Sequence, residues 1–170
     1  MATYDQPGQK VNTQFNADNI TIQAAPGPNA DELMARGRHA MKVRAYDEAI
    51  TAFEEAIKIQ PSAQGYYYHA LSLLQGRRPK LLTLTDAQAI EQKLRVAHEL
   101  DSVQAHYLYL WALVKFDFYL ANGFMLHPPG IEQLLAVAQS IPINRDATVE
   151  MLNHVQLSDN PITGFILDRL

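Results

Sequence analysis

The spacing of small, aromatic and proline residues between positions 37 and 61 limits the folds open to this 170-residue chain more than any other feature. Six residues stand at offsets of 0, 9, 12, 16, 19 and 24: Gly37, Tyr46, Ala49, Phe53, Ala56 and Pro61. Ala49, Phe53 and Ala56 are four and three residues apart, so they share one face of a helix. Gly37 and Ala56 are small enough for two helices to touch, and Pro61 ends the second helix because it has no N–H. The stretch therefore predicts two short helices packed closely together.

The same pattern returns 41 residues further along the chain. Tyr66 and Tyr68 have counterparts in Tyr107 and Tyr109. The apolar helix face is repeated as well, in Ile90, Leu94 and Ala97. The surplus over a unit of about 34 residues falls in residues 76–83, where glycine and proline predict a loop. The chain therefore contains an internal helical repeat.

These spacings resemble the tetratricopeptide repeat, a helix–turn–helix unit of about 34 residues. The resemblance implies an all-α array of about three helix pairs with a C-terminal helical cap, formed by residues 30–170. A terminal repeat needs a side on which nothing stacks, and we assign residues 131–170 to that cap. The array is predicted to contain helices at residues 30–44, 46–60, 62–75, 86–100 and 103–121.

Several local signals place the ends of these helices. Asn29 with Glu32, and Thr85 with Gln88, have the spacing of capping boxes that open the first and fourth helices. Asn122-Gly123 predicts the end of the fifth helix. In the cap, apolar spacing predicts short helices at about 131–140, at 146–154 and after Pro161.

Residues 1–29 differ from the rest in composition and are assigned to a separate segment and linker. Apolar residues alternate around positions 11–15 and 20–22, which predicts an extended segment or β-hairpin. A flexible tail is the alternative that composition favours. The segment also resembles short Asn/Gln-rich leaders of bacterial defence and signalling proteins. Since an isolated hairpin is marginally stable in water, it would become ordered either by lying on the helices or by pairing with another chain, which makes a homo-oligomer through residues 11–22 one of two alternatives.

The resemblance also implies a surface for a protein or peptide partner. In tetratricopeptide proteins the first helix of each pair lines the concave face and makes most peptide contacts. Carried over to this chain, the inward positions are Met34, Arg38, Met41, Lys42, Tyr68, Ser72, Gln75, Tyr109, Leu113 and Phe116. Aromatic and Met side chains beside Arg38 favour binding of an amphipathic or extended peptide. The alternative is that the same side chains form a core stripe buried against the tail, and the sequence leaves both open.

Composition and motifs point away from other function classes. The net charge of −4 gives no electrostatic case for nucleic acid or an anionic membrane. The chain has no cysteine, its six histidines lack metal-ligand spacing, and no phosphate-binding motif is present. We therefore predict no enzyme activity, no cofactor and no metal. Without a signal peptide or an apolar run of about 18 residues, the expected location is cytoplasmic.

The function predicted from the sequence is that of an adaptor or scaffold module that binds a partner through its concave helical face. Two alternatives stay open. One is a self-assembling structural protein that oligomerises through its N-terminal β segment. The other is a regulatory subunit of a bacterial defence or signalling complex.

Overall fold

The computed structural model describes residues 27–156 and 160–170, and this part of the chain is helical without strands. The helices are α1 (Ala30–Lys42), α2 (Tyr46–Ile59), α3 (Ala63–Leu73), α4 (Leu84–Leu100), α5 (Ala105–Val114), α6 (Ile131–Ser140), α7 (Arg145–Asn153) and α8 (Pro161–Leu167), with a 3-10 turn η1 (Pro79–Leu81) and a π-helical segment η2 (Lys115–Leu120). The all-α prediction is confirmed for these residues. The predicted N-terminal β segment and the self-association through residues 11–22 lie outside the described residues.

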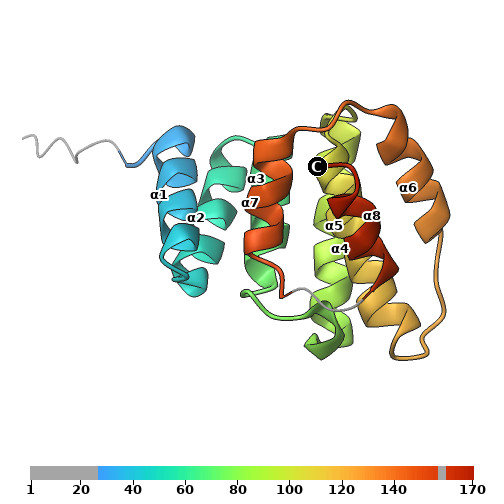
Figure 1. Ribbon diagram of the computed structural model, residues 1–170. Helices are drawn as coiled ribbons and strands as arrows, with labels where there is room; N and C mark the ends of the chain where they lie inside the picture. The colour runs from blue at the N-terminus through green and yellow to red at the C-terminus, as the bar shows by residue number, and fades with distance from the viewer. Residues whose placement is uncertain (1–26, 157–159) are drawn as a thin grey trace, which may run out of the picture.

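The helices follow one another as three packed pairs. α1 packs on α2, α3 on α4 and α5 on α6, while α2 also packs on α3 and α4 on α5 (Figure 1). Residues of the repeated apolar face are buried in both α2 and α4, with exposed fractions of at most 1%: Ala49, Phe53 and Ala56 in α2, and Ile90, Leu94 and Ala97 in α4. The positions related by the 41-residue interval therefore have the same burial in the two helices.

The crossing of α1 and α2 explains why position 37 holds glycine. A Cβ atom added to Gly37 would lie 2.5 Å from Cε1 of the Phe53 ring and 2.7 Å from its Cζ. Phe53 is fully buried, so its ring has no free space into which it can move. The absence of a side chain at Gly37 thus allows α1 to approach the aromatic face of α2.

Two helix starts test the predicted caps. Asn29 Oδ1 accepts a hydrogen bond from Glu32 N at 2.9 Å, and Glu32 accepts one from Asn29 N at 3.2 Å, which confirms the first capping box. The second prediction is wrong by two residues, because Thr83 rather than Thr85 caps α4. Thr83 Oγ1 accepts from Asp86 N at 3.1 Å and donates to the Asp86 carboxylate at 2.8 Å. Asp86 stands three residues after Thr83, at the same spacing as Gln88 after Thr85, and its carboxylate accepts from the capping hydroxyl.

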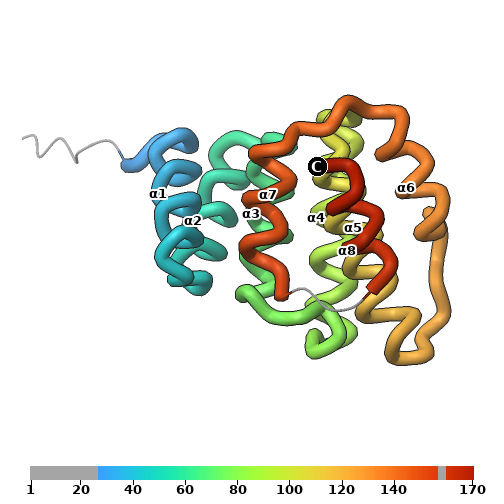
Figure 2. Tube along the Cα trace, in the orientation of Figure 1, coloured from blue at the N-terminus to red at the C-terminus, as the bar shows by residue number. Residues whose placement is uncertain are grey.

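The C-terminal region differs from the predicted end cap. α6 is the packing partner of α5, and the chain then turns back, so that α7 packs on α5 and bonds to α3 through Glu150, while α8 packs on α5 (Figures 1 and 2). The tail thus covers the face formed by α1, α3 and α5, which we call the α1/α3/α5 face. Across residues 27–156 and 160–170, no helix combines the length and apolarity that crossing a bilayer requires.

Candidate functional site

The ten predicted partner-binding residues divide into three groups by exposure. Five are buried: Met41, Tyr68, Ser72, Tyr109 and Leu113. Two are half-buried, Met34 and Phe116, and three are exposed, Arg38, Lys42 and Gln75. The buried residues belong to the core, as the alternative interpretation of the sequence expects. A binding role for the exposed residues stays a prediction.

The tail buries these side chains through specific contacts. The Tyr68 hydroxyl donates to Glu150 of α7 at 2.9 Å. Burial, and then the charge and hydrogen bond of Glu150, raise the pKa of Tyr68 to about 12. The Tyr109 hydroxyl accepts from Arg169, and its ring lies 6.3 Å from that of Phe165 in α8. α7 therefore covers the face at α3 and α5, and α8 covers it at α5.

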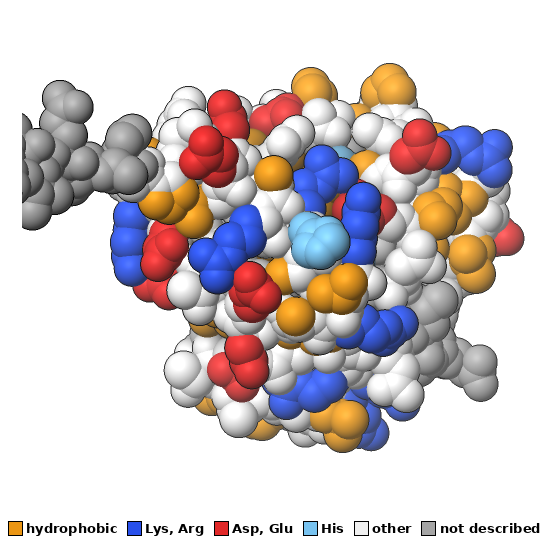
Figure 3. All heavy atoms as spheres, turned by 90° about the vertical axis from the view of Figure 1, so that its left-hand side faces the viewer, with side chains coloured by type: hydrophobic (Ala, Val, Ile, Leu, Met, Phe, Trp, Pro, Cys, Tyr) orange, Lys and Arg blue, Asp and Glu red, His pale blue; other side chains and the backbone are white. Residues whose placement is uncertain are grey.

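Arg38 lines three hollows, two of which border α7. The first, of about 540 Å³, lies between α1 and α7. The second, of about 410 Å³, lies between α1 and the start of α3, and the third, of about 350 Å³, lies between α7 and the starts of α3 and α5. Figure 3 faces the α1 end of the molecule and shows basic and acidic side chains side by side on this surface. We call the three hollows together the Arg38 groove.

Arg38 is held loosely in this groove. Its guanidinium lies 5.1 Å from the centre of the Tyr68 ring, within the range of a cation–π contact. Its Nη2 lies 3.6 Å from the Glu150 carboxylate, and the side chain of Arg38 is 47% exposed. An ion pair of this length and exposure contributes little stability because water screens it. Arg38 therefore keeps donors that a carboxylate of another molecule can reach.

Lys42 and Arg44 extend the basic wall of the 540 Å³ hollow. Neither side chain makes a hydrogen bond or ion pair with another residue of the described ranges. Arg44 has a φ of 59°, in the left-handed region that glycine adopts without strain. A side chain there costs about 1–2 kcal/mol relative to the ordinary helical region. The cleft thus presents two unpaired cations, one of them on a strained backbone.

The opposite wall contains His154 and two carboxylates, Asp146 and Glu150. His154 Nδ1 lies 3.2 Å from the Tyr46 hydroxyl. Burial lowers the pKa of His154, and Arg44 adds to this while Glu150 opposes it. The 540 Å³ hollow thus carries positive charge at and just after α1 and negative charge on α7, so an occupant meets both signs.

Two histidines, His69 of α3 and His106 of α5, are buried, and His106 also lines the 350 Å³ hollow. Burial lowers the pKa of His69 and of His106 to about 4, so both rings are neutral near pH 7. The ring of His106 packs at 4.8 Å against Tyr67. Among the described residues, His, Cys, Asp and Glu form no group of three that could hold a metal ion.

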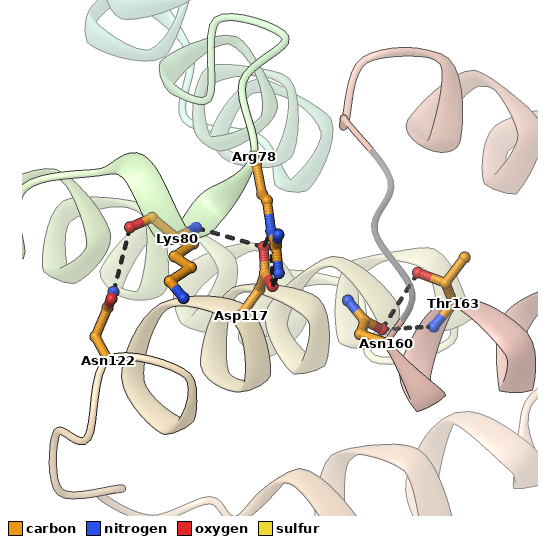
Figure 4. A network of polar contacts seen from close by, with 6 residues as sticks. All are labelled: Arg78, Lys80, Asp117, Asn122, Asn160 and Thr163. Atoms are coloured by element: carbon orange, nitrogen blue, oxygen red, sulfur yellow. Dashed lines mark hydrogen bonds and ion pairs between the residues drawn. The ribbon is translucent and has the colours of Figure 1, made fainter.

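Two buried ion pairs elsewhere in the fold escaped the sequence interpretation. Arg78 donates to both carboxylate oxygens of Asp117, with a shortest distance of 2.7 Å, and Lys80 N approaches the same carboxylate at 3.4 Å (Figure 4). Asn122 Nδ2 donates to Lys80 O at 3.2 Å, which completes the link between η1 and the end of η2. The Asp117 side chain is 2% exposed, so its ion pair with Arg78 is part of the folded interior.

The second pair joins Lys115 to Glu91 at 2.8 Å. Lys115 also donates to His127 O at 2.8 Å, and Trp111 Nε1 donates to Glu91 at 2.7 Å. Burial on its own raises the pKa of Glu91, but the hydrogen bonds from Lys115, Tyr119 and Trp111 outweigh it and hold that pKa below its usual value. Lys115 and Asp117 stand inside the apolar run 105–120. Charges embedded in such a run must be buried and paired, and this was the signal that could have revealed both pairs.

Comparisons with known proteins give no family. No protein-family model matches the chain, and no curated protein matches it. The resemblance to tetratricopeptide repeats therefore rests on the residues and spacings of this sequence.

Proposed function

We propose that this protein is a tetratricopeptide-like interaction module that binds a segment of a partner protein in the Arg38 groove. The observation that carries the proposal is the position of Arg38, which lines three adjoining hollows of about 540, 410 and 350 Å³. A groove of this kind suits an extended or helical peptide. An adaptor of this type has the cytoplasm as its expected location.

The charges of the groove indicate the chemistry of the partner. Arg38, Lys42 and Arg44 line the α1 side, and the last two have no side-chain partner among the residues described. Carboxylates of a partner gain charge-assisted hydrogen bonds from such donors. Arg44 has a φ of 59°, at which glycine would be less strained. The presence of arginine there is consistent with a binding role for its side chain. The proposed partner segment is therefore acidic on the side that faces α1.

Fluorescence anisotropy on the full chain tests this proposal with a panel of labelled 12-residue peptides in acidic, neutral and basic versions. We expect preference for acidic peptides and weaker binding as salt rises, because salt screens exposed charges. The variant Lys42→Glu/Arg44→Glu should bind the acidic peptides about tenfold more weakly, since two attractive pairs become repulsive.

A charge-matched variant serves as the control. Lys58→Glu/Arg95→Glu makes the same change in net charge at exposed positions of α2 and α4. Circular dichroism establishes that both variants keep their helices. If both variants bind acidic peptides equally well, or if acidic and basic peptides bind alike, the Arg38 groove is not the binding site.

A further inference from the structure

The position of α7 sets it apart from the six helices of the three pairs. It follows α6 but lies across the array beside α3, on the face that α1, α3 and α5 form (Figure 2). Its contacts therefore join segments that are far apart in the chain, such as Tyr68 and Glu150, which are 82 residues apart.

These contacts come from one side of α7 and from the turn that follows it. Thr148, Met151 and Val155 are buried and follow one another at intervals of three and four residues. Beside them, Glu150 accepts from Tyr68, and His154 meets Tyr46 at 3.2 Å. An apolar stripe with polar contacts at its edge is the arrangement by which an amphipathic helix binds in a groove.

The face is larger than the helix that occupies it. The hollows of about 540 and 350 Å³ lie on two sides of α7, and both have Asp146 and Glu150 in their walls. Only Thr148 and Met151 are buried within α7 itself. α7 thus leaves space on the α1/α3/α5 face that close packing would have filled.

α8 shows what a firmly attached tail helix looks like in the same protein. Ile162, Thr163 and Ile166 are buried within its seven residues. After it, Arg169 donates to Ala138 O at 2.8 Å at the end of α6, and also to the Tyr109 hydroxyl. α7 itself makes one short polar contact across the fold, the 2.9 Å hydrogen bond that Glu150 accepts from Tyr68, whereas its ion pair to Arg38 is 3.6 Å long and exposed. α8 therefore buries three of its seven residues, whereas α7 buries two of its nine.

We propose that the α1/α3/α5 face is a docking surface for an amphipathic helix, and that α7 is a resident occupant which a partner helix displaces. The partner helix carries a small residue at position i and apolar residues at i+3 and i+7, the places that Thr148 and Met151 of α7 and Val155 of the following turn take. At i+2 it carries a carboxylate, which takes the hydrogen bond of Tyr68 and the charge of Arg38 in place of Glu150. This inference rests on the proposed function and names the form that the partner segment takes.

A labelled peptide of residues 141–156, IPINRDATVEMLNHVQ, tests the inference when it is titrated against the full chain. In the wild-type chain the resident helix competes with it. The variant Val149→Pro breaks α7 at an exposed position without removing a contact residue. We expect this variant to bind the peptide at least about tenfold more tightly than the wild-type chain, because the competing state is removed. Val149→Ala is the matched control and should bind like the wild type.

The same titration has outcomes that overturn the inference. A peptide with Glu150→Lys and Met151→Ser should bind at least about tenfold more weakly, and equal binding would refute the proposed contacts. If Val149→Pro stays folded and binds the peptide no more tightly than Val149→Ala, the face does not accept a helix in trans. If Val149→Pro and a second variant, Glu150→Lys, both lose the cooperative unfolding transition, α7 is an integral part of the fold. Acidic peptides can still bind the groove beside α7 in either case, so the proposed function survives a failure of this inference.

Discussion

Replacing Gly37 with alanine tests how closely α1 and α2 cross. The added Cβ would lie 2.5, 2.7 and 2.8 Å from three atoms of the Phe53 ring. A buried aromatic ring cannot yield as the end of a flexible chain does, so the backbones must separate. Overpacking of this kind costs typically about 1–3 kcal/mol. Alanine returns about 1 kcal/mol of helix propensity, so the expected net loss in the free energy of unfolding is up to about 2 kcal/mol.

Urea denaturation followed by circular dichroism measures this loss, and Gly164→Ala is its control. Gly164 lies within α8, and a Cβ atom added there would meet no atom within 4 Å. Gly164→Ala should therefore leave stability unchanged or raise it by up to about 1 kcal/mol. In a Phe53→Leu background the clash is relieved, so Gly37→Ala should cost at least about 1 kcal/mol less than in the wild type. If Gly37→Ala alone is as stable as Gly164→Ala, the close crossing does not exist.

Two further predictions concern buried charge and pH. Asp117→Asn leaves Arg78 without its carboxylate and should lower the free energy of unfolding by about 2–3 kcal/mol. Asp86→Asn in the first turn of α4 removes a carboxylate that bonds only locally to Thr83 and should cost under about 1 kcal/mol, so equal losses would contradict the buried pairing. His106 has a pKa lowered from 6.5 to about 4 by burial, so its contribution to stability is present above pH 6.5 and is lost as pH falls toward 4, by about 1 kcal/mol per pH unit. His106→Phe should flatten the fall in urea midpoint between pH 6.5 and 4, and an unchanged slope would show that His106 is not held neutral.

The helix pairs could be predicted from the sequence because their signals are local. Ala49, Phe53 and Ala56 share a face by helical spacing alone, and the 41-residue interval transfers that face to Ile90, Leu94 and Ala97. Each decision depends on residues within a few turns of one another. All six residues are buried, three on α2 and three on α4.

The return of α7 depends on contacts that no local pattern contains. Tyr68 and Glu150 are 82 residues apart, and Tyr46 and His154 are 108 apart. From the sequence alone, Tyr46 and Tyr68 could each lie in an open groove or in a buried contact. The choice between the two interpretations of Tyr68 therefore depended on where the tail goes.

The same reasoning applies to the last turns of the fifth predicted helix. The sequence predicts one helix to residue 121, whereas the structure has α-helix to Val114 and π-helix over Lys115–Leu120. This segment contains Lys115 and Asp117, whose partners lie on α4 and before η1. A π-helical turn changes the direction of side chains relative to an α-helix. Helical spacing alone therefore could not indicate where these two charges point.

Charge and apolar fit have different parts in the competition for the α1/α3/α5 face. The pair between Arg38 and Glu150 is exposed, and such pairs contribute up to about 1 kcal/mol, so a carboxylate on a partner only matches what α7 already has. An advantage must come from side chains that fill the remaining space. Ala147 faces the 350 Å³ hollow and Val149 the 540 Å³ hollow. A partner helix with leucine at the position of Ala147 buries three more carbons, at about 0.8 kcal/mol each, which amounts to roughly a fiftyfold preference over α7. Acidic residues would then orient the partner helix, and its larger apolar residues would decide whether it displaces α7.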